Sequence, residues 1–300
     1  MIRLEAVGKV FGGRQAVDAI SLAVQPGEIF GLVGPDGAGK TTTIRMMTGV
    51  MTPSAGRITV LGEQDMERVK AHIGYVPQRF SLYGDLTVME NIRLMGALYG
   101  SSGREIELLA NDILAMTQLL PFKERLAANL SGGMKQKLAL AAGLMHQPKL
   151  LFLDEPTTGV DPVSRREFWQ VLYRLNQTGT TVFVSTPYMD EAELCGRIAF
   201  MHNGSLTAVG TPQQLKEQYP YRIIELETNS KALKRQLAGV AIRDINSFGD
   251  KYHIVVDEYE TVAAAIKQVL DSAGIPILAM REVKPVLEDV FVSLAGEGGS

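Results

Sequence analysis

Runs of apolar residues divide the first 220 residues into strands and connections. Residues 2–10 and 16–24 alternate apolar and polar positions around Gly12-Gly13, which predicts two half-buried antiparallel strands. Four mostly apolar runs follow, at residues 29–33, 73–77, 149–153 and 180–185. Such runs are typical of strands that are buried on both faces of a parallel sheet. Because helical segments separate these runs, the pattern predicts an α/β domain.

Helical periodicity marks the middle of the chain. From residue 87 to about residue 116 apolar side chains recur at helical spacing, with a break at residues 100–103. A further helix runs from Ser131 to about His146 and ends before a proline. Together these segments predict a helical subdomain over about residues 86–145, between the first helix and a later strand.

The last 80 residues differ from the rest. Over residues 221–295 the elements are strand, helix, strand, strand, helix, strand, helix, which predicts a small ferredoxin-like α+β domain. This stretch has no glycine-rich loop and no metal-ligand spacing, which favours a structural or interaction role. Residues 296–300 are expected to form a flexible tail or the start of a linker. We therefore expect a main domain at 1–220, an accessory domain at 221–295 and a short tail.

Composition and charge exclude several classes of protein. Hydrophobic residues make up 46% and charged residues 21% of the chain, and 30 basic against 33 acidic side chains give a net charge of −3. No basic excess is available to recruit nucleic acid or an anionic membrane. The single cysteine, Cys195, excludes an internal disulfide and fits a reducing cytoplasm. We expect no signal peptide and no membrane span, so another chain or another part of a longer gene product would supply any membrane part.

A glycine-rich segment after the run at 29–33 carries the first candidate chemistry. It fits the pattern G-x-x-x-x-G-K-[ST], and its strand–turn–helix context is the one that phosphate binding requires. Amides of such a loop surround a phosphate, Lys40 reaches the β- and γ-phosphates, and the Thr41 hydroxyl binds Mg²⁺. The sequence predicts a nucleoside triphosphate site formed by Gly34, Pro35, Asp36, Gly37, Ala38, Gly39, Lys40, Thr41 and Thr42.

Two carboxylates follow the apolar run at 149–153. Asp154 and Glu155 are expected at the carboxyl end of a central strand, where ligands gather in open α/β sheets. We expect Asp154 to hold Mg²⁺ through water. Glu155, on the other side of the turn, is expected to polarise the attacking water as a general base.

Two further features have two interpretations each. The segment LSGGMKQ at 130–136 is either an ordinary helix N-terminus capped by Ser131 or a second anion site. A second anion site out of reach of the first would imply a dimer that holds nucleotide between two copies. Phe11, beside Gly12-Gly13, is either a hydrophobic plug at a turn or a ring that stacks on a nucleotide base.

Taken together, the motifs resemble those of the ATP-binding subunit of an ABC transporter. The loop at 34–41, Gln78, LSGGMKQ, the run at 151–155 and Gly159-Val160-Asp161 occur in the family's order over residues 1 to about 220. The resemblance implies an ABC-type P-loop NTPase fold with a mixed sheet core, an antiparallel β subdomain and a helical subdomain. It also implies ATP hydrolysis, with ATP and Mg²⁺ bound.

The resemblance further implies a head-to-tail pair of cassettes, either a homodimer or a tandem or heterodimeric pair. Each ATP would lie between one phosphate loop and a set of residues from the partner cassette, namely Ser131, Gly132, Gly133 and Gln136. Phe11 would stack on the base and Asp161 would contact the partner. Gln78 would bind Mg²⁺, take part in catalysis and sense the transmembrane part.

A membrane partner is also implied by the resemblance. Residues 78–91, with Phe80 and Tyr83, would face the coupling helix of a separate permease, which places the protein in the cytoplasm on the inner face of the cell membrane. The stretches at 184–193 and 287–291 are similar to those of the drug-exporter (ABC-2) branch. Asp36 resembles the residue at this position in the tandem-ATPase exporters of that branch.

One position departs from the family's pattern. The family has a histidine that contacts the γ-phosphate where this chain has Pro187. Proline suits the N1 position of a helix capped by Thr186, but it donates no hydrogen bond. Loss of such a contact often reduces the rate on the order of 10²-fold. We therefore expect secure ATP binding and slow hydrolysis.

Other classes of function remain as alternatives. A catalytically weak regulatory cassette, paired with a second cassette, is favoured by Pro187 and by the glycine-rich tail. A soluble ABC ATPase acting on ribosomes or DNA is less well matched, because such proteins carry two cassettes with a basic linker or a long coiled-coil insertion. We expect no nucleic acid partner.

Overall fold

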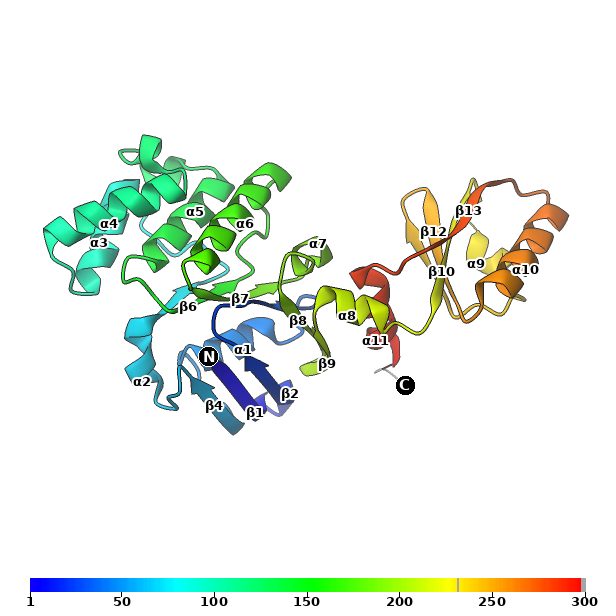
Figure 1. Cartoon of the computed structure of the whole chain (residues 1–300), viewed down its shortest axis with the longest axis horizontal. Helices are drawn as coiled ribbons and strands as arrows, with labels where there is room; N and C mark the ends of the chain where they lie inside the picture. The colour runs from blue at the N-terminus through cyan, green and yellow to red at the C-terminus, as the bar shows by residue number, and fades with distance from the viewer. Residues whose placement is uncertain (231, 298–300) are drawn as a thin grey trace. The chain divides into compact units, whose positions relative to one another are not determined.

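The computed structural model describes residues 1–230 and 232–297. They form two compact units, one from Met1 to Pro212 and the other from Gln213 on. Each unit has its own sheet and its own hydrophobic core (Figure 1).

A six-stranded sheet forms the centre of the first unit. Its strand order is β5-β6-β7-β3-β8-β9; the first five strands are parallel and β9 is antiparallel to β8. Strands β3, β6 and β7 are buried along their whole length, which is why they appear as unbroken apolar runs. The bounds are β3 (Ile29–Val33), β5 (Ile73–Val76), β6 (Leu150–Asp154), β7 (Thr181–Thr186), β8 (Arg197–His202) and β9 (Ser205–Gly210).

A smaller antiparallel sheet of order β2-β1-β4 packs against the large one. It comprises β1 (Ile2–Phe11), β2 (Arg14–Val24) and β4 (Ala55–Val60). The alternating pattern turns side chains such as Leu4 and Val17 inward, where they share one core with Phe30 and Phe183 of the large sheet. The expected half-buried strands at the start of the chain are therefore confirmed.

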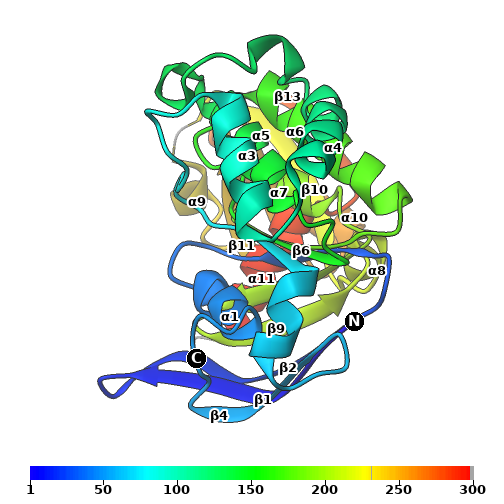
Figure 2. The same cartoon turned by 90° about the vertical axis from the view of Figure 1, so that its left-hand side faces the viewer.

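Helices α3, α4 and α5 lie together on one side of the first unit in both views (Figures 1 and 2). Each of α3 and α4 begins with a capping box, formed by Thr87 with Glu90 and by Ser102 with Glu105. Helix α1 packs against β2, β4 and β6 instead. The helices of this unit are α1 (Lys40–Met47), α2 (Met66–Val69), α3 (Val88–Leu98), α4 (Gly103–Met116), α5 (Gly132–Gly143), α6 (Pro162–Gln177) and α7 (Met189–Ala192), with 3₁₀ turns at Lys70–His72, Leu120–Phe122 and Ala127–Asn129.

The second unit contains an antiparallel sheet of order β11-β12-β10-β13. The two central strands, β10 and β12, are the first and third along the chain. A helix follows each of them, as in a ferredoxin-like βαββαβ domain. Side chains of α10 such as Ile266 and Leu270 pack with Ile224 and Leu226 of β10. The elements are α8 (Pro212–Glu217), β10 (Arg222–Thr228), α9 (Leu233–Gln236), β11 (Asp244–Phe248), β12 (Lys251–Val256), α10 (Tyr259–Ser272), β13 (Ile277–Val283) and α11 (Leu287–Glu297).

Three element bounds differ from expectation in this unit. The helix expected near 231–237 is one turn, α9, and the strand expected at 241–245 begins only at Asp244. Helix α11 continues to Glu297, so the expected tail at 296–300 overlaps its last turn, and residues 298–300 lie outside the described part of the chain. Short elements of mixed composition have weak periodicity, which explains the errors at their ends.

No helix in the described part of the chain combines the length and hydropathy needed to cross a bilayer.

Candidate functional site

The loop between β3 and α1 has a backbone that only glycine allows at two positions. A Cβ atom on Gly34 would lie 2.1 Å from the Met201 carbonyl oxygen, and the Gly34 amide donates to the Thr186 carbonyl at 3.2 Å. Gly39, the residue before α1, has φ +108°, which side chains rarely permit. The loop thus passes tightly over the carboxyl end of the sheet and ends at a helix N-terminus, where anions are stabilised.

Lys40 folds back over this loop and is 3% exposed. Its ammonium donates to the carbonyls of Gly34 and Pro35 at 2.7 and 2.9 Å. It also lies 3.0 Å from Glu155 Oε1, so a buried ion pair joins the loop to the end of β6. A cation is therefore held directly above the loop.

Asp154 and Thr41 meet beside that ion pair. The Thr41 hydroxyl donates to Asp154 Oδ1 at 3.0 Å, and the Ser185 hydroxyl donates to the same oxygen at 2.8 Å. Burial raises the pKa of the Asp154 carboxyl, while the hydrogen bonds from Ser185 and Thr41 act in the opposite direction. A hydroxyl and a carboxylate oxygen in one place form the hard oxygen donor set that Mg²⁺ prefers.

Glu155 occupies a backbone conformation that is costly for a residue with a side chain, with φ +47°. Its amide donates to both the carbonyl and the hydroxyl of Ser185, at 3.1 and 3.0 Å. Its Oε2 accepts the Gln78 side-chain amide at 2.9 Å and lies 3.3 Å from the Thr158 hydroxyl. The surrounding hydrogen bonds hold this carboxylate in one direction, toward Lys40 and Gln78.

These groups surround a cavity of about 240 Å³. It is lined by Ala16, Asp36, Gly37, Gly39, Lys40, Thr41, Thr42, Gln78 and Glu155. A loop of amides, one buried cation and a carboxylate–hydroxyl pair fit a triphosphate with its Mg²⁺, since Mg²⁺ commonly takes only one or two protein carboxylates and completes its shell with phosphate and water. No cluster of three or more His, Cys, Asp or Glu side chains that could hold a metal occurs among the described residues.

Ten of the expected site residues do not line the cavity, namely Phe11, Gly34, Pro35, Ala38, Ser131, Gly132, Gly133, Gln136, Asp154 and Asp161. Phe11, 46% exposed at the end of β1, has the Lys9 ammonium 5.2 Å from its ring centre. Ser131 caps α5 through the Met134 amide, and Asp161 caps α6 through the Ser164 amide, a bond that lowers the Asp161 pKa. Gln136 is buried along α5.

The two capped helix ends lie side by side. A Cβ on Gly133 would lie 2.5 Å from Ser164 Cβ, so α5 and α6 approach each other through this glycine. A Cβ atom on Gly132, in contrast, would meet only the Gly159 carbonyl oxygen, at 4.0 Å. A side chain at this position would therefore have room within one chain. Within one chain the segment LSGGMKQ at 130–136, called the signature segment below, and Asp161 form a second patch outside the cavity.

Two expectations about local structure need correction. Helix α7 begins at Met189 with Tyr188 as its N-cap, so Pro187 precedes the cap instead of occupying N1. The Thr186 hydroxyl still accepts the Tyr188 amide, at 3.1 Å. Phe80, expected with Tyr83 to face a permease from an exposed position, is half-buried, with the Lys135 ammonium 6.0 Å from its ring centre, whereas Tyr83 is 57% exposed.

Sequence reasoning missed Ser185 and Ala16. Ser185 pairs in register with Asp154 across β6 and β7, which brings its hydroxyl to the Asp154 carboxylate and to the Glu155 backbone amide. A hydroxyl at the end of the neighbouring apolar run was the available signal. Ala16 lies on β2, and no local pattern pointed to it because it reaches the loop only through the packing of the two sheets.

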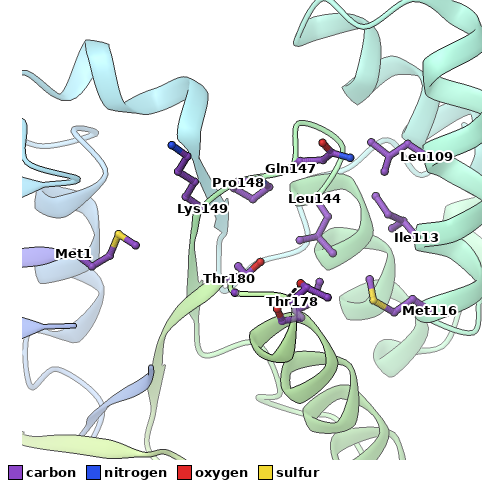
Figure 3. Close-up of a pocket in the computed structure, with 12 residues that line it drawn as sticks. Met1, Leu109, Ile113, Met116, Leu144, Gln147, Pro148, Lys149, Thr178 and Thr180 are labelled. Carbon is purple, nitrogen blue, oxygen red and sulfur yellow. Dashed lines mark hydrogen bonds between the residues drawn. The ribbon is translucent and has the colours of Figure 1, made fainter. Parts of the chain in front are cut away.

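A larger cavity of about 540 Å³ lies at the opposite edge of the large sheet (Figure 3). Its lining includes residues just before β6 and β7, such as Lys149 and Thr180. Apolar side chains of α4 project into it, among them Leu109, Ile113 and Met116 (Figure 3). None of the candidate site residues lines it.

Comparison with known protein families agrees with this geometry. Residues 17–158 match the family described as ABC transporter, and residues 210–295 match the C-terminal domain of DrrA1-3-like ATP-binding proteins. Among solved structures, the dimeric ATP-binding cassette MJ0796 bound to ADP and Pi has a TM-score of 0.65 and 27% identity, covering 70% of this chain and 98% of that one.

Curated relatives extend the match to the whole chain. The probable multidrug ABC transporter ATP-binding protein YbhF of Escherichia coli K12 is 38% identical over 309 residues, and this chain spans 53% of its length. The linearmycin resistance ATP-binding protein LnrL of Bacillus subtilis is 35% identical, with 99% of this chain and 98% of LnrL covered. The Nod factor export ATP-binding protein I of Rhizobium etli is 37% identical, with coverages of 97% and 92%. The chain therefore belongs to the ATP-binding subunits of ABC transporters, in the drug-exporter branch of that family.

Proposed function

We propose that this protein binds and hydrolyses ATP to drive export of a substrate through a separate membrane permease. The observation that carries the proposal is that Lys40, Thr41 and Glu155 line one cavity at the carboxyl edge of the sheet, where the Thr41 hydroxyl donates to Asp154. The relatives named for multidrug, linearmycin and Nod factor export support the export direction. The substrate would be selected by the permease.

ATP binding in this proposal depends on the loop and Lys40. Backbone amides between Asp36 and Thr42 would donate to the phosphates, and the Lys40 ammonium would leave Glu155 to bind the β- and γ-phosphate oxygens. Thr41, Asp154 and Gln78 would hold Mg²⁺, which supplies charge neutralisation for the transferred phosphoryl group. Phe11 would stack on the base.

The hydrolytic step depends on Glu155. Once Lys40 has moved to the phosphates, the Glu155 carboxylate would keep its contacts to Gln78 and Thr158 and be free to orient and polarise a water molecule. The move of Lys40 to the phosphates would thus also free Glu155 to act as the general base. Slow turnover is part of the proposal, because Pro187 donates no hydrogen bond.

Pro187→His is expected to raise the maximal ATPase rate by about 10²-fold, because an imidazole would restore a donor at the end of β7. The proline lies before the helix cap and its amide nitrogen donates no hydrogen bond, so the exchange removes no bond from α7. The rate is measured by phosphate release from purified protein under saturating Mg-ATP. Pro187→Ala serves as the control and should leave the rate unchanged; an equal gain in both variants would contradict a role for the imidazole.

The separation of the signature segment from the cavity supports a dimer in which each ATP contacts both chains. Gly132 has room for a side chain within one chain, whereas Gly133 does not. Gly132→Glu should leave the isolated chain folded and weaken ATP-dependent dimerisation by roughly 10²-fold, since the new carboxylate would face the partner's γ-phosphate.

Dimerisation is measured by analytical ultracentrifugation with and without ATP, in a Glu155→Gln background that prevents hydrolysis. Thermal unfolding without nucleotide checks the fold of the Gly132→Glu chain. Gly132→Ala is the matched control and should retain dimerisation. Full ATP-dependent dimerisation of the glutamate variant would argue against the proposed arrangement.

A permease contact is proposed at residues 78–91. Asn91 is fully buried and its amide donates to the carbonyls of Tyr83, Leu86 and Thr87 at 2.9, 3.3 and 3.0 Å. This ties the loop to α3 while leaving Tyr83 exposed. A rigid loop with an exposed aromatic ring suits a binding surface, and it would place the protein at the cytoplasmic face of the membrane.

Reconstitution tests the function as a whole. The chain is co-expressed with the membrane proteins encoded beside it, and Mg-ATP hydrolysis is compared in detergent and in proteoliposomes. Co-purification with a permease and stimulated hydrolysis are expected. Co-sedimentation with ribosomes, without any permease, would favour the soluble alternative. Partnership with a second, faster cassette would favour the regulatory alternative.

A further inference from the structure

Glu191 is a buried carboxylate outside the cavity around Lys40. It is 1% exposed and lies on α7. Its Oε1 accepts the Thr157 hydroxyl, and its Oε2 accepts the Thr186 hydroxyl at 2.6 Å. One side chain thus joins two segments that are far apart in the sequence.

The first of these segments carries Glu155. Thr157 is 1% exposed and begins a tight turn in which its carbonyl accepts the Val160 amide at 3.0 Å. Glu155 itself has the unfavourable φ of +47°, and such a conformation persists only where the surroundings enforce it. Ser185 holds the Glu155 amide on one side, and the Thr157–Glu191 bond anchors the chain on the other.

The second segment leads to the phosphate loop. The carbonyl of Thr186 accepts the Gly34 amide at 3.2 Å, while its hydroxyl is held by Glu191. The following residue is Pro187, which donates no hydrogen bond of its own. The same carboxylate therefore holds the end of β7 at the point where β7 contacts the loop.

Arg165 balances the charge of this buried group. Its Nε lies 3.5 Å from Glu191 Oε1, and its side chain is 20% exposed. The guanidinium lies over the Tyr188 ring at 4.1 Å and pairs with Asp190 at 3.3 Å. A buried carboxylate held by two hydroxyl donors and a neighbouring guanidinium has its position fixed from three sides, so it can act as an anchor.

We propose that Glu191 is a positioning residue for hydrolysis: through Thr157 and Thr186 it holds Glu155 and the end of β7 in the geometry that the chemical step requires. Glu191 is not among the residues that line the cavity, so it would act on the rate and not on nucleotide affinity. The inference rests on the proposed ATPase function. A small displacement of a catalytic group can reduce a rate by about 10²-fold, whereas binding by the loop and Lys40 would be unaffected.

The test compares kcat and nucleotide Kd in full-length protein. Glu191→Ala is expected to lower kcat by about 10- to 100-fold with Kd for Mg-ATP changed less than about twofold. Glu191→Gln, which retains an oxygen acceptor, should recover part of the loss. Thr157→Val should also lower kcat. Combined with Glu191→Ala it should add little to the loss, because both substitutions remove the same hydrogen bond between Thr157 and Glu191. Asp190→Asn, on the same helix and paired to the same arginine, is the matched control with kcat unchanged.

Amide hydrogen exchange gives a second readout. Exchange in residues 155–160 should become faster in Glu191→Ala and stay unchanged in Asp190→Asn. Unchanged kcat and unchanged exchange in Glu191→Ala would overturn the inference while leaving the proposed function intact. A weaker Kd equal to the loss in kcat would also overturn it, since that result indicates general damage. Absence of hydrolysis by the unaltered protein, with and without its permease, would instead overturn the proposed function and the inference with it.

Discussion

Glu155→Gln is expected to reduce ATP turnover by about 10²- to 10⁴-fold while ATP binding is retained, because the amide cannot accept the proton of the attacking water. The structure adds a second expectation about affinity. Glu155 pairs with Lys40 at 3.0 Å, and the substitution removes the negative charge that competes with phosphate for this lysine. The affinity for Mg-ATP should therefore stay the same or increase.

Turnover is measured by phosphate release and affinity by calorimetric titration with Mg-ATP, both on full-length protein. Thr158→Val is the matched control, since it removes the weaker 3.3 Å contact to Glu155 Oε2 and leaves the carboxylate in place. It should reduce the rate only slightly. Vigorous hydrolysis that persists in Glu155→Gln would show that another group activates the water.

Lys40→Met is expected to weaken Mg-ATP binding by roughly 10- to 100-fold, the loss of one or two charge-assisted hydrogen bonds. The same substitution should lower the free energy of unfolding without nucleotide by about 3 kcal/mol, because it leaves the Glu155 carboxylate buried without its cation. Affinity is measured by calorimetry and stability by urea unfolding followed by the fluorescence of Trp169.

A double variant separates the two effects of Lys40. Lys40→Met combined with Glu155→Gln should recover most of the lost stability, since no unpaired charge remains, yet it should still bind Mg-ATP weakly. Recovery of both properties would mean that Lys40 contributes to binding only through Glu155. Loss of stability that is unchanged in the double variant would mean that the Lys40 contacts to Gly34 and Pro35 dominate.

Much of the fold followed from local patterns. The runs at 29–33, 149–153 and 180–185 are strands β3, β6 and β7, because a strand buried on both faces is mostly apolar. The capping residues Thr87, Ser102 and Ser131 begin helices as such residues do elsewhere. Errors fell on short elements such as α7 and α9, in which one helical turn leaves little periodicity, and on the end of α11.

Strand order was beyond the reach of these patterns. Nothing in the spacing of apolar residues placed β3 between β7 and β8, since the buried strands all show the same apolar pattern. The strand order depends instead on how side chains far apart in the sequence pack together. That order is what brings the loop after β3 next to the end of β7, where the Gly34 amide meets the Thr186 carbonyl.

The sequence by itself determined the chemistry of the candidate site: a phosphate loop, a lysine, a hydroxyl and two carboxylates at a strand end, whose types and local spacing are set by neighbours along the chain. Only the tertiary structure decided the connections: the ion pair of Lys40 with Glu155, the hydrogen bond of Ser185 with Asp154 and that of Thr157 with Glu191. Each of these joins residues that are far apart in the sequence. Long-range pairs of this kind leave no periodic trace, because they arise from strand register and helix packing and not from the local preferences of the backbone.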